Sequence, residues 1–306
     1  MLIDIHAHAY RVRPPYIRFS TLPELLAGQE RLGIDKSVVL PIVNPEIYIP
    51  QNTEDIIEMA RQYPDRIIPF CNVDPRAMSN SPHAPLERVL EYYKEQGCLG
   101  VGEIMPNMRM DDPKVQNLFR AAEKVGLPVT CDGSDQLDGD FGLYDEIGLP
   151  QLELSLRRFP KLIIFGHGPV FWAEIAKLET PGERGVPLEF GSCRQVSGVN
   201  GGSCLPNYMQ PIREEGVVPK LLRRYPNLHL DLSDFTAYNA LIRDVDYTAE
   251  FVKEFEDRMY FGTDWISADT EVPLIDTLKQ WKSRGVISVA AYNKITHENA
   301  MRLLKL

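Results

Sequence analysis

Short apolar runs rich in β-branched residues recur along this chain, and each is followed by a polar turn and a segment with helical periodicity. Runs of this kind are typical of buried strands. Eight of them occur, at residues 2–5, 37–41, 67–71, 99–104, 127–131, 162–165, 228–232 and 258–262. All but one pair of neighbouring starts lie 28 to 35 residues apart. That spacing is about the ~30 residues that one strand and one helix need.

Amphipathic helices are predicted between these strands, at residues 22–32, 53–63, 85–96, 114–125, 149–158, 171–177, 212–224, 247–256, 275–282 and 290–304. Alternating strands and helices predict a parallel sheet, and eight units favour a closed (β/α)8 TIM barrel over an open doubly wound sheet. The sequence contains neither of the glycine-rich nucleotide-binding motifs. We therefore expect one α/β domain that spans residues 1–306.

The one long interval separates the sixth and seventh strands. Residues 178–209 within it are rich in glycine and proline, which predicts a long inserted loop and no further strand–helix unit. The loop follows a strand end at the face where barrel enzymes keep their chemistry. We interpret it as a lid over that face, with an inert insertion as the alternative.

Composition and charge narrow the classes of protein further. Of 306 residues, 44% are hydrophobic and 25% are charged, as in soluble globular proteins. The excess of 43 acidic over 33 basic residues gives a net charge of −10, which opposes binding to nucleic acid or to anionic membranes. With no signal peptide, no long apolar segment and no CxxC pair among five cysteines, we expect a cytoplasmic protein.

The first strand ends in two histidines, His6 and His8, which project to the same side because side chains alternate along a strand. Two imidazoles on one rigid edge are half of a metal site.

Carboxylates that could complete such a site lie on later strands. Glu103 lies in a glycine-flanked apolar strand, where it needs a salt bridge or a cation. Asp132 ends the fifth strand, as a ligand or as the start of a turn with Gly133.

Two further strand ends carry side chains that could bind a metal or take part in catalysis. His167 stands between two glycines after the sixth strand, where there is backbone room for a ligand. Asp264 ends the eighth strand and could both bind a metal and take a proton from water. Asp231 and Ser233 on the seventh strand are expected to be supporting hydrogen-bond partners. Trp172 either lines a pocket that binds substrate or belongs to the core.

These candidates converge although they are distant in sequence. His6, His8, Glu103, Asp132, His167 and Asp264 all fall at carboxyl ends of predicted strands, which is where the sites of barrel enzymes assemble. That shared position is stronger than any single motif. The residues therefore predict an enzyme that uses a bound divalent metal.

The sequence resembles the amidohydrolase superfamily, in particular the amidohydrolase-related branch that includes aminocarboxymuconate-semialdehyde decarboxylase and related aromatic-acid decarboxylases. The resemblance spans nearly the whole chain, in the segments IDIHAH, GVGEI, GLPV, FPKLIIFGH, YPNLHLDLS, FGTDW and ENAMRLL. It implies that His6, His8 and Asp264 bind a divalent metal, usually zinc, and that His167 lies beside a metal-bound water.

One position departs from that pattern. The family usually has a histidine ligand where this chain has Asp132, and an oxygen ligand shifts the preference toward harder ions such as manganese or magnesium. The segment around Glu103 is also similar to that of TatD-type nucleases, in which the glutamate is a metal ligand. Glu103 could therefore complete the site or bridge a second ion.

Three functions stay open at this stage. The first is metal-dependent hydrolysis of an ester, lactone or amide bond in a small organic acid, with Asp264 as the proton acceptor and His167 as the group that stabilises the oxyanion or orients the water. The second is non-oxidative decarboxylation of an aromatic or unsaturated acid. The third is a barrel that binds a ligand without catalysis. Loop arginines such as Arg184, Arg194 and Arg213 could pair with an anionic substrate, and a homodimer is the expected assembly.

Overall fold

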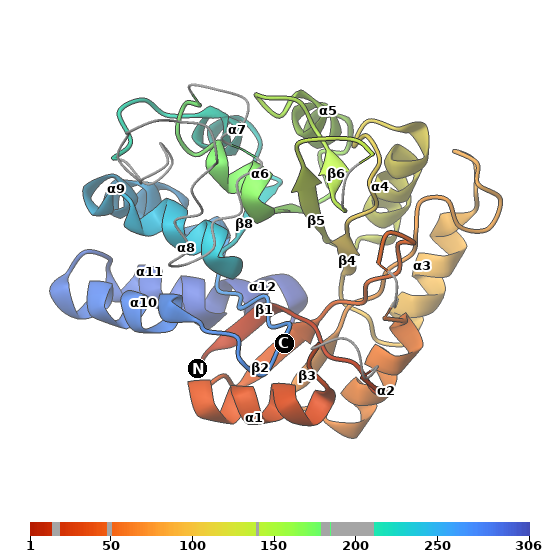
Figure 1. The fold of residues 1–306 in the computed structure, drawn as a ribbon, viewed down its shortest axis with the longest axis horizontal. Helices are drawn as coiled ribbons and strands as arrows, with labels where there is room; N and C mark the ends of the chain where they lie inside the picture. Colours follow the sequence, from red (N-terminus) through yellow and green to blue (C-terminus); the bar gives the residue numbers. More distant parts are fainter. Residues whose placement is uncertain (14–18, 48–50, 139–140, 179–183, 185–210) are drawn as a thin grey trace, which may run out of the picture.

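Eight parallel strands form the centre of the computed structural model, which describes residues 1–13, 19–47, 51–138, 141–178, 184 and 211–306 (Figure 1). The strands coincide with the eight apolar runs. They are β1 (Ile3–Ala7), β2 (Lys36–Val39), β3 (Ile67–Pro69), β4 (Val101–Ile104), β5 (Val129–Ser134), β7 (Ile164–His167), β8 (Leu228–Asp231) and β9 (Met259–Tyr260). A two-residue strand, β6 (Leu143–Tyr144), pairs with the end of β5 and was not predicted.

Backbone hydrogen bonds close these strands into a barrel. The regular pairing gives the orders β1-β2-β3 and β4-β5-β7-β8-β9. Between β3 and β4, the Cys71 amide donates to Gly100 and the Gly102 amide donates to Cys71. Between β9 and β1, the Ile5 amide donates to Phe261 at 3.0 Å. The predicted TIM barrel is therefore confirmed.

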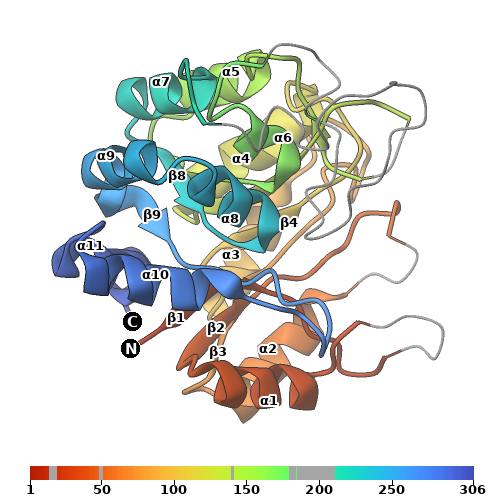
Figure 2. The ribbon, with the colours of Figure 1, turned by 60° about the vertical axis from the view of Figure 1, so that its left-hand side comes forward.

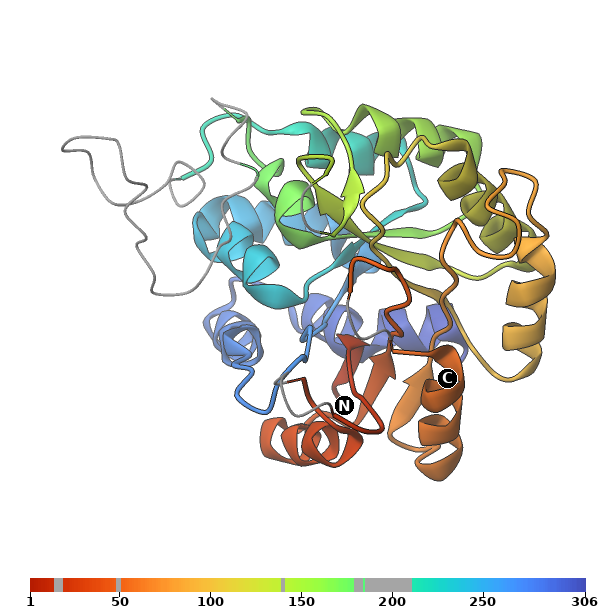
Figure 3. The same cartoon turned by 45° about the vertical axis from the view of Figure 1, so that its right-hand side comes forward.

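Helices lie outside the strands in all three views (Figures 1, 2 and 3). They are α1 (Leu22–Leu32), α2 (Thr53–Gln62), α3 (Leu86–Glu95), α4 (Pro113–Val125), α5 (Pro150–Arg158), α6 (Gly168–Ala173), α7 (Val217–Arg224), α8 (Asp234–Ile242), α9 (Val245–Phe255), α10 (Pro273–Arg284), α11 (Val289–Asn293) and α12 (Asn299–Leu304). A 3-10 turn (Glu256–Arg258) precedes β9, and a π turn (Lys294–Glu298) joins α11 to α12. Among the described residues, no helix combines the length and apolar character that crossing a membrane requires.

Helix α8 is the main element that the sequence pattern missed. It follows β8 directly and packs against α6, so it is covered on more than one side. Its buried residues include Thr236, Ala237, Asn239 and Leu241, which do not form the single apolar stripe of a surface helix. Periodicity alone could not find a helix of this kind.

Apolar side chains from several strands fill the barrel. Ile5, Val38, Phe165 and Tyr260, which come from β1, β2, β7 and β9, belong to one buried cluster. The candidate metal ligands lie beyond this cluster, at the carboxyl ends of the strands, as in other TIM barrels. Of the predicted inserted loop, residues 178 and 184 are described, and the remainder lies outside the described residues.

Candidate metal centre

Four side chains, from strands β1 and β4 and from the segments that follow β1 and β9, converge at the carboxyl end of the barrel. The Nε2 atoms of His6 and His8 lie 3.1 Å apart. The Oε2 atom of Glu103 lies 3.4 Å from His6 Nε2 and 3.3 Å from His8 Nε2. The Oδ1 atom of Asp264 lies 3.6 Å and 3.5 Å from the same two nitrogens. The convergence predicted for these four residues is therefore present.

The opposite nitrogen of each imidazole fixes where its proton sits. His8 Nδ1 lies 2.9 Å from the carbonyl oxygen of Leu40, and His6 Nδ1 lies 2.6 Å from Asp231 Oδ2. Both oxygens are acceptors, so both Nδ1 atoms carry the proton in neutral rings. The two Nε2 lone pairs then face each other and two carboxylates. Such a set of acceptors repels itself unless protons or a metal ion lie among them.

The spacing of these atoms fits a divalent cation. Ligand atoms about 2.1 Å from one ion lie about 3.0 to 3.4 Å apart, depending on the coordination geometry. The five distances above run from 3.1 to 3.6 Å. Metal-binding histidines also usually donate their other N–H to a carboxylate or a backbone carbonyl, as His6 and His8 do.

The charges around the two histidines also favour a bound cation. Burial lowers the pKa of both histidines, but the carboxylates around them outweigh it. Asp231 and Glu103 raise the pKa of His6 well above its usual value, and hydrogen bonds to Asp264 and Glu103 raise that of His8 to about 9. The cage therefore attracts positive charge, and a metal must displace protons to enter it.

A second group of ligand atoms adjoins the first and shares Glu103 with it. The Oε1 atom of Glu103 lies 3.6 Å from His167 Nε2, and the ligand atoms of Glu103, Asp132 and His167 all lie within 4.8 Å of one another. Burial, together with the charges of Glu103 and Asp264, raises the pKa of Asp132 well above its usual value. Asp132 therefore groups with His167 here, and its role as a metal ligand stays a prediction.

Asp231 and Ser233 support this arrangement, as their strand position predicted. Asp231 Oδ2 lies 2.6 Å from His6 Nδ1 and 3.5 Å from His167 Nδ1. Ser233 Oγ lies 3.0 Å from His167 Nδ1. The end of β8 and the start of α8 therefore contact a metal-ligand candidate and the neighbouring histidine.

The two glycines beside His167 make room for the protein's own side chains. A Cβ atom on Gly166 would collide with the ring of Phe171. Gly168 has a φ of +83°, and a Cβ atom there would collide with the carboxylate of Asp132. The glycines that suggested space for a ligand thus allow α6 and Asp132 to approach the strand end closely.

Asp4 was missed as a contributor to the site. Its Oδ1 atom accepts the amides of His6 at 3.0 Å and Thr263 at 2.9 Å, and its Oδ2 atom accepts the hydroxyls of Thr263 and Ser37. It therefore joins the segment that carries His6 to the one that carries Asp264. Polar residues at every second position from Asp4 to His8 were the available signal.

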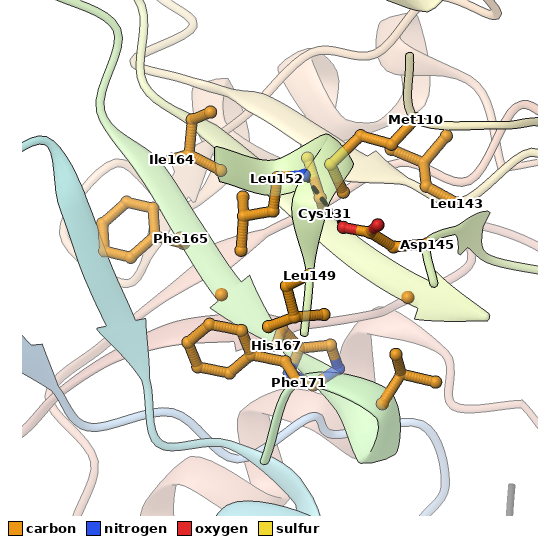
Figure 4. A pocket seen from close by; sticks show the side chains of 13 residues that line it. Met110, Cys131, Leu143, Asp145, Leu149, Leu152, Ile164, Phe165, His167 and Phe171 are labelled. Carbon is orange, nitrogen blue, oxygen red and sulfur yellow. Dashed lines mark hydrogen bonds between the residues drawn. The ribbon is translucent and has the colours of Figure 1, made fainter. Parts of the chain in front are cut away.

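An apolar pocket lies behind His167, between strands β5 and β7 and helices α5 and α6 (Figure 4). Its lining includes Cys131, Leu149 and Phe171, with Asp145 as the one carboxylate among the lining residues. Burial raises the pKa of Asp145 to about 7, although it accepts the backbone amides of Gln151 and Leu152. Asp145 thus titrates near neutral pH in this apolar wall.

Trp172 and Arg194 were the predicted substrate contacts. Trp172 is 1% exposed, and its Nε1 donates to the carbonyl oxygen of Asp231 at 3.1 Å, which matches the core alternative. Its contact with substrate stays a prediction. Arg194 lies outside the described residues.

Comparisons with protein-family models and with curated proteins give no match. Solved structures do match over almost the full chain. One is the probable 2-pyrone-4,6-dicarboxylic acid hydrolase from Acinetobacter baumannii, solved with citric acid bound. It is 16% identical with a TM-score of 0.58, and the match covers 100% of this chain and 99% of that one. An uncharacterised TIM-barrel protein from Bordetella bronchiseptica is 17% identical with a TM-score of 0.58, over 99% and 98% of the two chains.

A third structure is 5-carboxyvanillate decarboxylase from Novosphingobium aromaticivorans, with bound manganese and 3-methoxy-4-hydroxy-5-nitrobenzoic acid. It is 15% identical with a TM-score of 0.61, and the match covers 100% of this chain and 97% of that one. Aromatic-acid decarboxylases are the group that the sequence motifs resemble. At these identities the comparison establishes the fold, so the chain has the TIM-barrel fold of these proteins.

Proposed function

We propose that this chain is a metal-dependent enzyme of the amidohydrolase type that hydrolyses an ester, lactone or amide bond in a small organic acid. One observation carries the proposal. Two imidazoles and two carboxylates, from His6, His8, Glu103 and Asp264, converge in a largely buried cage whose negative charge a divalent cation would neutralise.

These four residues would hold the cation. When bound, a divalent ion supplies Lewis acidity and lowers the pKa of a bound water, which is the chemistry that hydrolysis at neutral pH needs. Zinc is the ion that the sequence resemblance favours, whereas a donor set of two nitrogens and two carboxylates also suits manganese. Bound manganese in 5-carboxyvanillate decarboxylase supports the second choice.

Asp264 is the proton acceptor in this proposal. Its side chain is 22% exposed, whereas those of His6, His8 and Glu103 are at most 3% exposed, so it lies where water can reach it. Burial raises the pKa of Asp264, but His6, His8 and His167 together lower it below its usual value. Asp264 is therefore ionised and ready to take a proton from an attacking water.

Non-oxidative decarboxylation of an aromatic or unsaturated acid is the second candidate. The solved structures of the fold favour it, because a decarboxylase is among them. In that reaction His167 or Asp264 would deliver the proton to the carbon that loses CO₂. The same cage would serve both reactions, and the net charge of −10 supports a small molecule as the substrate over nucleic acid or membrane.

Product analysis separates the two reactions. Purified protein loaded with zinc or manganese is incubated with lactones and with carboxylated aromatics, and CO₂ is assayed beside new carboxylate. Hydrolysis is expected to give carboxylate without CO₂, and release of CO₂ without hydrolysis would replace the first candidate with the second. Elemental analysis accompanies the assay. Protein that holds no stoichiometric metal and is inactive on both sets would instead support a barrel that only binds ligands.

Assembly and location are separate predictions. We infer a homodimer, which is the commonest oligomer, and a cytoplasmic location. Sedimentation of the purified protein tests the first of these.

A further inference from the structure

The backbone of Asp264, the candidate ligand that we propose as proton acceptor, has an uncommon conformation. Its φ is +50°, in the left-handed region that residues other than glycine rarely adopt. Such a conformation persists only where the surrounding structure imposes it. The contacts of the residues on either side of Asp264 therefore decide where its carboxylate lies.

The preceding residue, Thr263, is fixed to the first strand. Its amide donates to Asp4 Oδ1 at 2.9 Å, and its hydroxyl donates to Asp4 Oδ2 at 2.8 Å. The amide of Asp264 itself donates to the carbonyl oxygen of His6 at 2.8 Å. The chain therefore enters Asp264 from a segment that polar contacts hold against β1.

The following residue, Trp265, is held by its backbone and by its side chain. Its amide donates to Thr263 Oγ1 at 3.1 Å, and its carbonyl oxygen accepts the amide of His8 at 2.8 Å. Its indole Nε1 donates to Ser20 Oγ at 2.8 Å, and the residue is 2% exposed. Trp265 thus links two candidate ligands, because it follows Asp264 in the chain and bonds to the backbone of His8.

The indole ring of Trp265 rests on helix α1 at Gly28. Gly28 belongs to the buried face of this helix, together with Leu22 and Leu25. A Cβ atom on Gly28 would lie 2.3 Å from Cη2 of the indole, and 2.6 and 2.8 Å from Cζ2 and Cζ3. The guanidinium of Arg31, also on α1, lies 5.6 Å from the ring centroid. The close approach of the ring therefore requires glycine at position 28.

We propose that Trp265 is a positioning residue, and that its contact with Gly28 sets the distance between the Asp264 carboxylate and His8. The Oδ1 atom of Asp264 lies 3.5 Å from His8 Nε2. A shift of the indole moves both ligands, since Asp264 precedes Trp265 and the His8 amide bonds to the Trp265 carbonyl oxygen. Helix α1 thereby shapes the metal cage without contributing a side chain to it.

This inference deepens the proposed function and rests on it for what the position of Asp264 means chemically. A carboxylate that binds the ion and accepts a proton from water must stay at a fixed place relative to both. The constraint comes from an apolar cluster outside the barrel, in which Trp265 packs with Ala7 and Leu25. A change in α1 that adds no polar group should therefore alter metal binding.

Gly28→Ala tests the proposal with one added methyl group. Alanine favours a helix more than glycine does, so the substitution should not weaken α1 itself. The methyl group must displace the indole. Protein stripped of metal by a chelator is titrated with Co²⁺, whose visible absorption bands report its coordination geometry. The affinity is expected to fall about tenfold, as for other groups that orient a ligand, and the bands are expected to shift.

The same substitution in a Trp265→Phe background shows whether its effect passes through the ring. Phenylalanine lacks the outer part of the indole, which contains the three atoms nearest Gly28. Gly28→Ala should therefore cause little further loss of Co²⁺ affinity in this background. An equal loss in both backgrounds would contradict a path through Trp265. Trp281→Phe is the matched control, because Trp281 is also buried but lies in α10 and in a different apolar cluster.

Ser20→Ala is the second variant, and it decides the matter if Gly28→Ala does not fold. It removes only the hydroxyl that accepts the indole N–H, so a loss of Co²⁺ affinity of about threefold is expected. Circular dichroism establishes that each variant is folded. An affinity within experimental error of the unmodified protein, with unchanged absorption bands, would overturn the proposal in either variant.

The outcome is distinguishable from failure of the proposed function. Co²⁺ binding that depends on Gly28 in a protein without turnover would support the role of Trp265 and contradict the proposed reaction. Turnover in a protein whose Co²⁺ affinity and absorption bands are the same in all variants would do the reverse. Unmodified protein that binds no Co²⁺ would overturn both.

Discussion

The barrel holds buried histidines at two levels along its axis, and the groups around them shift the imidazole pKa in opposite directions. His6 at the carboxyl end lies among Asp231, Glu103 and Asp264, which together raise its pKa well above the usual value although burial opposes this. His229 lies nearer the amino end of β8 and stacks on Tyr260, with its Nδ1 2.9 Å from the Tyr260 hydroxyl. Burial lowers the pKa of His229 to about 3, and the charge of Arg258 adds to the effect.

Burial alone therefore does not make a histidine functional. Both residues are at most 9% exposed, yet one lies in a cage that attracts positive charge and the other is kept neutral. The difference lies in whether buried carboxylates face the ring. Metal binding, pH dependence and substitution should each separate the two levels.

The largest difference is expected for the ligands themselves. His8→Gln should lower the affinity for zinc or manganese at least about 100-fold and abolish turnover, since it removes a nitrogen from the cage. His229→Gln is the matched control and should retain stoichiometric metal, because His229 pairs with the Tyr260 hydroxyl and not with a member of the cage. Elemental analysis after dialysis measures both. Equal metal content in the two variants would erase the distinction between the two levels.

A smaller loss of metal affinity is expected for Asp231, which contacts the ligand His6. Asp231→Asn removes the charge that orients His6, so metal affinity should fall about 10- to 100-fold while the ligands stay in place. Titration with a competing chelator measures this. Asp145→Asn, which also neutralises a buried carboxyl group but outside the cage, should leave the affinity unchanged. An affinity of Asp231→Asn within twofold of the unmodified protein would show that Asp231 only fills space.

Asp132 tests how far the cage extends. Asp132→His places an imidazole where the related family usually has one, so the preference for zinc over manganese should rise several-fold if this side chain reaches the ion. Competition between the two ions at equal concentration measures the ratio. An unchanged ratio would leave Asp132 as a partner of His167 and Glu103 outside the coordination sphere.

The position of the site could be predicted from the sequence because the strands recur at regular intervals along the chain. Strand ends in a barrel meet at one face, so His6, Glu103, His167 and Asp264 could be grouped before any contact was known. The same reasoning placed Asp231 among the supporting residues.

What it could not supply was contact-level detail. Asp4 is linked to Thr263 across 259 positions of sequence, and no local pattern reports such a pair. The two glycines around His167 suggested ligand space, but Phe171 and Asp132 occupy it. Helix α8 was missed because it is covered by α6. Each of these is a tertiary effect on a locally ambiguous segment.

The smallest expected effect concerns Asp145, a buried carboxyl group outside the metal cage. It is 1% exposed in the apolar wall behind His167, and burial raises its pKa to about 7 from a usual value of about 3.9. The folded state therefore binds this proton more tightly than the unfolded state does. The stability that the proton contributes is fully present below the unfolded pKa and is lost as pH rises through about 7. Between about pH 8 and about pH 6 the unmodified protein should gain about 1 kcal/mol of unfolding free energy relative to Asp145→Asn.

Urea unfolding of both proteins at the two pH values measures this gain, with Asp65→Asn, at an exposed position, as the control that should show no such change. A difference between the unmodified protein and Asp145→Asn that does not vary with pH would mean that Asp145 stays charged in the folded state. In that case the hydrogen bonds from Gln151 and Leu152 would outweigh burial, as the carboxylates do at His6. The experiment therefore asks, at a third buried site, whether partners or burial decide the charge of a group.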